Sequence, residues 1–208
     1  MRKLSELALW SGLVCGASYA FAVDIPGGQT ETAESLPANT YQLLLSPAYL
    51  LNEGGAYLSG KIRYQPNDRF GVGFVFGSGS GELGFQFGVE GIWHAFPQSR
   101  YQPAAALHVS GHFDRVARAN FFALEVAPIV SQRFHTLFGE LTPYGGLRIT
   151  PSFGIGQPLN QISLKTSVGG EWVISGTEGL QVWSEVGIAL VNSLDEIVVG
   201  LSYPFAAL

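Results

Sequence analysis

Residues 71–93 read GVGFVFGSGSGELGFQFGVEGIW, with a glycine at every second or third position and aromatic rings between the glycines. Bulky side chains alternate with small ones on both sides of the cluster 77–81, and alternation with a period of two predicts β-strands. The cluster itself, rich in glycine and serine, predicts a turn. The stretch is therefore predicted to be a β-hairpin with a bulky face and a glycine-rich face, and not a low-complexity linker.

The two faces of this hairpin predict different surroundings. The bulky, outward set comprises Val72, Phe74, Phe76, Leu83, Phe85, Phe87, Val89 and Trp93. The inward set comprises Gly71, Gly73, Gly84 and Gly88. Glycines within a strand mark places where other groups approach closely, so we expect them to leave space beside Lys61, Arg63 and Glu90. Any opening through the protein is expected along this bare inward face.

The same alternation recurs over most of the chain. Nine turn signals separate ten predicted strands, at approximately 39–50, 55–65, 69–77, 82–96, 101–113, 119–133, 141–153, 160–174, 179–191 and 196–205. Most of them reach the length of about 9–11 residues that a tilted membrane-spanning strand needs. Eight strands are the alternative, if two of these merge or the first is a lead-in.

Composition and aromatic placement favour a membrane barrel over a soluble sandwich. Charged residues are 13% of the 208, against about 25% in an average soluble domain. Aromatic residues form one level near the expected periplasmic ends of the strands and a second near the opposite ends, as two lipid–water interfaces select. The first level is Tyr41, Tyr64, Phe70, Trp93, Tyr101, Phe134, Trp172, Tyr203 and Phe205. The expected fold is an all-β, antiparallel, up-and-down transmembrane β-barrel over residues 39–208.

The N-terminal segment has the pattern of a secretory signal. Arg2 and Lys3 precede an apolar stretch at 7–19, and Ala20-Phe21-Ala22 fits a small-x-small cleavage site. Residues 1–22 are therefore expected to be removed. The single cysteine, Cys15, lies in this segment, so no disulfide is expected. Residues 23–38 are polar and are expected to form a flexible periplasmic lead, or alternatively to fold into the lumen as a partial plug.

The chain ends in Gly200-Leu201-Ser202-Tyr203-Pro204-Phe205, followed by three further residues. With the signal and the alternating strands, this ending resembles small outer-membrane β-barrel proteins of diderm bacteria, in the broad porin-like and OmpA-like superfamily. The resemblance implies that Gly200, Tyr203 and Phe205 form the signal read by the barrel-assembly machinery. It further implies a monomer in contact with outer-membrane lipid and lipopolysaccharide, with both termini in the periplasm.

The inward face is predicted to carry charge in equal amounts. Its expected ion network consists of Lys61, Arg63, Arg148 and Lys165 with Glu90, Glu125, Glu171 and Glu185, which sum to zero. Charges inside a narrow barrel have to be paired, and Arg148, Glu125 and Lys165 are expected to form one cross-strand cluster. This network predicts a largely occluded lumen. A narrow polar pathway for small solutes or ions is the alternative.

The segment 108–112, HVSGH, is the one candidate for catalysis. His108 and Ser110 share a face, and Glu125 could orient the histidine. The pair resembles the His-x-Ser of outer-membrane lipid A deacylases in those two letters only, and it points to the lumen, so His94, His108, Ser110 and His112 are expected to be polar lumen residues. Because His108 and His112 would lie about 13 Å apart along a strand, no metal site is expected.

No other motif suggests chemistry or a macromolecular partner. The net charge of −5 provides no basic surface for nucleic acid, and neither a cofactor nor a catalytic residue is expected. The sequence predicts a non-enzymatic outer-membrane barrel with a charge-balanced, largely occluded lumen and a structural or envelope-related role. A narrow channel and a lipid-modifying enzyme are the alternatives.

Overall fold

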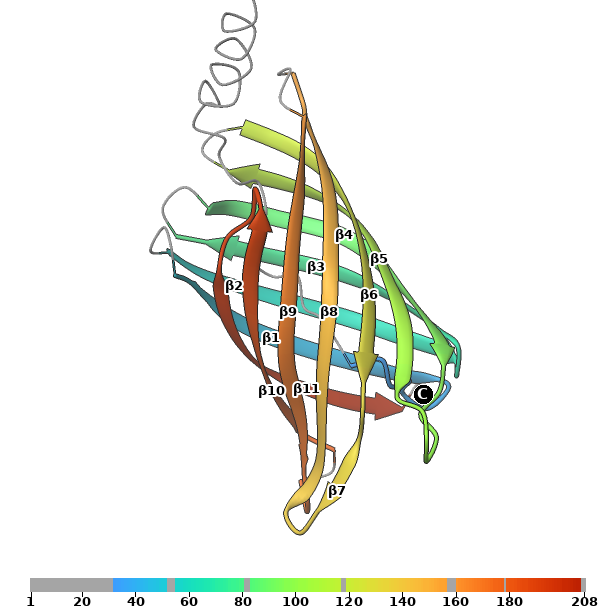
Figure 1. Ribbon diagram of the computed structural model, residues 1–208. Helices are drawn as coiled ribbons and strands as arrows, with labels where there is room; N and C mark the ends of the chain where they lie inside the picture. The colour runs from blue at the N-terminus through green and yellow to red at the C-terminus, as the bar shows by residue number, and fades with distance from the viewer. Residues whose placement is uncertain are drawn as a thin grey trace, which may run out of the picture.

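The computed structural model describes residues 32–51, 55–80, 83–116, 119–156, 160–177 and 179–206, so the predicted signal and residues 23–31 lie outside it. Within these ranges the chain forms an antiparallel barrel without helices (Figure 1). Its strands are β1 (Thr40–Leu50), β2 (Gly55–Asn67), β3 (Phe70–Gly79), β4 (Leu83–Phe96), β5 (Ala104–Val116), β6 (Ala119–Ser131), β7 (Phe134–Thr136), β8 (Gly139–Gly154), β9 (Asn160–Ile174), β10 (Gln181–Val191) and β11 (Glu196–Ala206). No helix in this part of the chain is long and apolar enough to cross a membrane.

Ten long strands close the barrel, which confirms the predicted fold class. Each long strand pairs with its neighbours in sequence, and β1 closes the ring by pairing with β11, from Thr40 opposite Ala206 to Leu50 opposite Glu196. The short β7 pairs only with β8, while β6 pairs with β8 directly. Closure leaves no long strand with an unpaired edge, as a membrane span requires.

Several predicted boundaries differ from the observed ones. Residues 101–103 precede β5, so Tyr101 lies outside the strands. Asp114 was predicted to begin a turn but belongs to β5. The turn predicted at 135–140 is a β7–β8 hairpin that projects beyond the barrel, at the lower end of Figure 1. The end of the barrel that holds Thr40 and Ala206 is called the proximal end below, and the opposite end the distal end.

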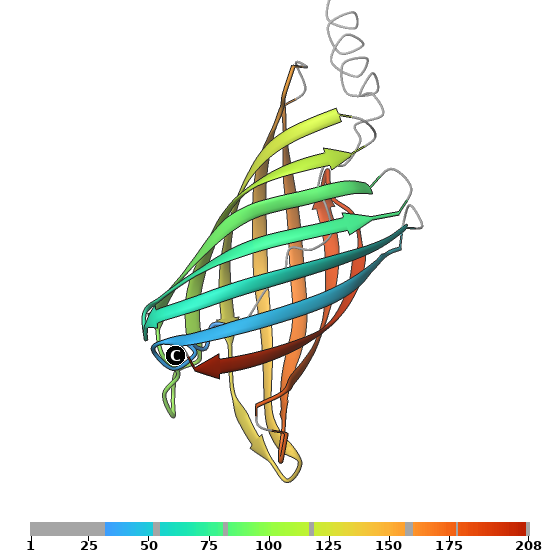
Figure 2. The same cartoon turned by 180° about the vertical axis from the view of Figure 1, so that it is seen from behind.

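The outer face of the barrel is a continuous apolar surface. Leu43 and Leu45 of β1, Val89 of β4 and Leu201 of β11 are each about half exposed or more. In both views the strands run steeply around the wall (Figures 1 and 2), and alternate residues of each point outward. Soluble proteins do not leave an apolar belt of this extent in water, so the outer face is built to contact lipid.

The aromatic residues of the predicted proximal level differ in exposure. Tyr41, Phe70, Trp93, Phe134, Trp172, Tyr203 and Phe205 are exposed, whereas Tyr64 is half-buried and Tyr101 is in the β4–β5 connection. The Tyr41 ring lies 4.8 Å from the Tyr64 ring and 5.7 Å from the Phe205 ring. These contacts join β2, β1 and β11 across the closing seam.

The bare face of β3 is filled by side chains from its neighbours. A Cβ on Gly73 would lie 2.7 Å from Glu90 Oε1, and a Cβ on Gly71 would lie 2.7 Å from Gln65 Oε1. The Tyr57 side chain covers Gly77 in the same way. The expectation of an opening along these glycines is therefore wrong, because the space they leave is occupied by longer side chains.

Candidate functional site

The interior of the barrel has three levels along its axis. A cavity lies at the proximal end, charged side chains lie at the centre, and an apolar cluster lies toward the distal end. Inward positions on every long strand supply these side chains, because alternation places every second residue in the lumen.

Glu90 is the centre of the first charged group. Its carboxylate lies 2.7 Å from Lys61 Nζ, 3.3 Å from Arg63 Nη2 and 3.1 Å from His108 Nε2. The side chains come from β2, β4 and β5, and all are almost fully buried. A carboxylate with two cations and a histidine around it satisfies charges that would otherwise be costly to bury.

His108 links this group to Glu125 of β6. Its Nε2 faces Glu90 and its Nδ1 lies 3.2 Å from Glu125 Oε1. Ionised carboxylates only accept hydrogen bonds, and both ring nitrogens donate only in the imidazolium form. The geometry therefore makes His108 a cation between two carboxylates, and its role is to pair them.

A second charged group lies on the opposite wall. Arg148 of β8 pairs with Glu185 of β10 and, at 3.4 Å, with Glu196 of β11. Lys165 of β9 lies 3.0 Å from Glu196, and the Tyr144 hydroxyl donates to Glu185 at 3.1 Å. None of these four charged side chains is more than 2% exposed. Cations and carboxylates thus alternate around the centre of the lumen.

The structure changes the predicted composition of the network. Arg148 and Lys165 are neighbours in register, but their ion pairs go to Glu185 and Glu196, while Glu125 pairs with His108. Glu196 and Asp114, both fully buried, were missed because they border turn signals. Glu196 has the same parity as Ser202 on β11, and Asp114 has the same parity as His112 on β5, so alternation would have placed both inside.

A charge-balanced interior was predicted, but the described side chains do not balance. With histidines neutral, four lysines and arginines face six carboxylates, an excess of two negative charges. The imidazolium at His108 reduces the excess to one. Among the described side chains, Glu171 is the predicted network member that makes no hydrogen bond and no ion pair within 4.0 Å.

An apolar cluster lies toward the distal end of the lumen. It contains Ala48, Leu50, Tyr57, Val116, Phe121, Trp183, Leu194 and Val198. Its members come from β1, β2, β5, β6, β10, β11 and the turn before β11, so the cluster spans the lumen. An inward apolar layer was not predicted, because the inward face was expected to be polar.

Residues 32–37, the described part of the predicted lead, lie against the inner wall at the proximal end. Ala33 packs in a second apolar cluster with Ile92, Ala104, Ala106, Ile129 and Tyr144. The Ala33 amide donates to Ser131 Oγ at 3.0 Å, and the Ala33 carbonyl lies 2.9 Å from His94 Nδ1. Glu34 lies 3.4 Å from Arg133, and partial burial raises the pKa of its carboxyl group. These contacts hold the lead inside the mouth.

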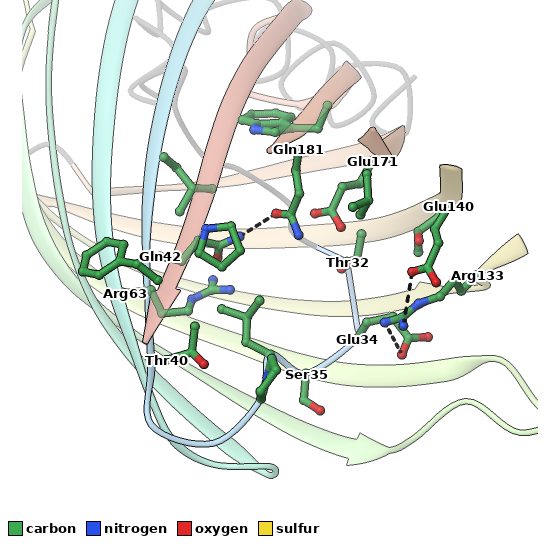
Figure 3. Close-up of a pocket in the computed structure, with 18 of the residues that line it drawn as sticks. Thr32, Glu34, Ser35, Thr40, Gln42, Arg63, Arg133, Glu140, Glu171 and Gln181 are labelled. Carbon is green, nitrogen blue, oxygen red and sulfur yellow. Dashed lines mark hydrogen bonds and ion pairs between the residues drawn. The ribbon is translucent and has the colours of Figure 1, made fainter. Parts of the chain in front are cut away.

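The proximal cavity has a volume of about 600 Å³ (Figure 3). One wall is the lead segment, and the others are β1, β2, β8, β9, β10 and β11. Gln42, Gln181 and Glu171 point into it, and Arg133 with its partners Glu34 and Glu140 lies at one side (Figure 3). Glu171 is thus a cavity side chain and not a member of the central ion network.

The candidate catalytic segment has a different geometry from the one expected. Ser110 Oγ lies 3.4 Å from His112 Nδ1, and His112 Nε2 lies 3.2 Å from Asp114 Oδ2. Ser110 therefore neighbours His112, while His108 and Glu125 are engaged in the ion network. The proximal cavity does not include these residues. The described residues contain no group of three histidine, cysteine, aspartate or glutamate side chains that could hold a metal ion.

The residues of the expected assembly signal occupy the last strand. Tyr203 and Phe205 face outward and are about 40% exposed. Gly200 faces inward beneath the Trp183 indole, which stands where its Cβ would be. The glycine therefore also has a packing reason inside the barrel.

No family model and no curated protein matches the chain. Among solved structures it is similar to a de novo designed transmembrane β-barrel, with 15% identity, a TM-score of 0.42 and coverage of 82% of this chain and 99% of the other. It is similar to an outer membrane channel from Pseudomonas putida F1, with 11% identity, a TM-score of 0.45 and coverage of 88% and 100%. It is also similar to the N-terminal beta-barrel domain of Pseudomonas aeruginosa OprF, with 11% identity, a TM-score of 0.36 and coverage of 82% of this chain and 100% of the other. Similarity at this level assigns no function to the chain.

Proposed function

We propose that the protein is a non-enzymatic β-barrel of the outer membrane of a diderm bacterium, closed to solutes, with its proximal end in the periplasm. The observation that carries the closed lumen is the burial of Lys61, Arg148 and Lys165, which are at most 2% exposed. A water-filled pore would hydrate the charged side chains that line its centre. The distal apolar cluster adds a second barrier.

The proposed role is structural or envelope-related, and the proposed partners follow from the surface. The apolar belt contacts lipid and lipopolysaccharide, and the barrel-assembly machinery inserts the chain through its last strand. A closed ring of strands has no edge that recruits a second copy, which supports a monomer.

A narrow channel is the second candidate, because the proximal cavity extends into the lumen and the interior carries excess negative charge. Such a channel would select cations. Reaching the distal side would require the central ion pairs and the apolar cluster to separate.

Conductance of the refolded protein in a planar bilayer tests the closed lumen. We expect no discrete steps, and insertion is verified by the heat-dependent gel mobility of the recovered protein. Discrete cation-selective steps would show that the protein is a channel and not a closed barrel.

The lipid-modifying alternative predicts a mass change in lipid A upon expression that disappears in Ser110→Ala, and we expect no mass change.

A further inference from the structure

We infer that the proximal cavity binds a small organic cation, an ammonium group on an apolar body, and that the Glu171 carboxylate is its counter-ion. The cavity volume of about 600 Å³ lies within the range of about 300–1,000 Å³ typical of small-molecule sites. The inference concerns the cavity alone and holds whether or not the barrel conducts.

The side chains that line the cavity carry more negative than positive charge, so a bound cation would complement them. Four carboxylates, Glu34, Asp68, Glu140 and Glu171, face two guanidinium groups, Arg63 and Arg133. Arg133 is paired with Glu34 and Glu140, at 3.4 and 3.5 Å. Arg63 is paired with Glu90 at 3.3 Å. Within the described residues, Glu171 inside the cavity and Asp68 at its rim are left without an ion pair.

Polar atoms that line the same cavity as Glu171 complement an ammonium group. Gln42 Nε2 donates to Gln181 Oε1 at 2.9 Å and to Ser202 Oγ at 3.3 Å. This arrangement leaves Gln42 Oε1 without a hydrogen bond in the described structure. An ammonium group has three donors, so the Glu171 carboxylate and an amide oxygen provide the acceptors it needs. Figure 3 shows Gln181 and Glu171, from neighbouring strands, both directed into the cavity.

The rest of the lining determines the body of the ligand. Leu44, Val173, Trp183 and Pro204 provide apolar surface. A cation with an aliphatic or aromatic body therefore matches the site better than a hydrated inorganic ion. The strands enclose the cavity and separate it from the bilayer, so the ligand is a free solute that enters from the proximal end.

The test uses three isosteric probes on the full refolded barrel in micelles of a zwitterionic detergent. Calorimetric titration compares benzylamine with the neutral benzyl alcohol and the anionic benzoate. We expect benzylamine to bind at least tenfold more tightly than either. Equal binding of benzylamine and benzyl alcohol would overturn the inference.

Two variants locate the effect. Glu171→Gln should remove the preference for benzylamine and leave benzyl alcohol unchanged, while Glu140→Gln, an equal change in charge at a side chain paired with Arg133 and His135, should retain the preference. Retained preference in Glu171→Gln, or equal weakening of both probes, would show that Glu171 is not the counter-ion. Glu171→Leu provides the same test should the glutamine variant fail to refold.

Discussion

The Lys61 ammonium group lies 2.7 Å from the Glu90 carboxylate, and both side chains are almost completely buried in the centre of the barrel. Glu90 also binds Arg63 and His108. A single carboxylate therefore holds three cationic partners from two other strands, whereas Glu171 on the opposite wall has no cation within ion-pair distance among the residues that the structure describes.

Replacing Glu90 and Glu171 by glutamine should have different effects on the free energy of unfolding. Glu90→Gln leaves buried cations without their counter-charge and should lower the free energy of unfolding by about 3–5 kcal/mol. Glu171→Gln removes a carboxylate that has no ion pair in the described part of the chain and should be neutral or stabilising. Urea unfolding of the two refolded variants measures the difference. Equal losses would mean that Glu171 has a partner in the folded protein.

Phe121 and Phe122 are adjacent in β6 but face different surroundings. Phe121 is 3% exposed in the distal apolar cluster, whereas Phe122 is 43% exposed on the lipid face. Phe121→Ala should leave a cavity and lower the free energy of unfolding by about 3–5 kcal/mol. Phe122→Ala should cost distinctly less, because lipid fills the space. The same unfolding measurement compares them, and a larger loss at Phe122 would contradict the assignment of faces.

Gly200 should be required for packing as well as for assembly. Gly200→Ala places a methyl group against the Trp183 indole, and overpacking of this kind costs about 1–3 kcal/mol. In a Trp183→Leu background the cost should shrink. Refolding purified protein in detergent excludes the assembly machinery, so an unchanged stability of Gly200→Ala there would assign the glycine to assembly alone.

The Ala33 amide should be protected from hydrogen exchange. Its hydrogen bond to Ser131 Oγ and its apolar seat hold the lead in the mouth. Ser131→Ala should reduce this protection at least tenfold, while Ser152→Ala, at a buried serine of β8, should not. NMR exchange at the Ala33 amide provides the measurement. Rapid exchange in the unaltered protein would show that the lead is released in solution.

Docking of the lead should weaken as the pH rises. Burial raises the pKa of Glu34 above its ordinary value of about 4.5, so the docked state favours the protonated carboxyl group. The contribution of this group is fully present below the ordinary pKa and is lost as the pH rises through the raised value. Protection at Ala33, corrected for the intrinsic exchange rate, measures the profile. Glu34→Gln should flatten it, which separates the effect of Glu34 from that of His94, whose Nδ1 lies 2.9 Å from the Ala33 carbonyl.

Alternation was enough to predict the barrel but not its interior contacts. Leu43 and Leu45 lie outward and Gln42 inward, as their parity requires. Register alone does not decide which side chains meet: Ala127 lies opposite His108 and Val126 lies opposite Ile149, so Glu125 is about equally offset from His108 and Arg148. Its ion pair goes to His108, while Arg148 pairs with Glu185. One-residue uncertainty at a turn is enough to remove Asp114 from the inward set.

Parity does place apolar residues inside the barrel. Along β6, Phe121 and Ile129 share the parity of the inward Glu125 and lie inside, while Phe122 and Val130 lie outside. Parity does not show that Phe121 meets residues of β1, β2, β10 and β11 in one cluster. The apolar site that holds Ala33 is formed by four strands that are distant from it in sequence, so no local sequence pattern indicates it.

The docked lead also has a consequence for the order of events during synthesis. The seat of Ala33 is built from β4, β5, β6 and β8, all of which emerge after it. The pairing of β1 with β11 likewise waits for the last segment of the chain. The earliest described residues are therefore among the last to reach their final positions, and their docking reports that the ring around them is complete.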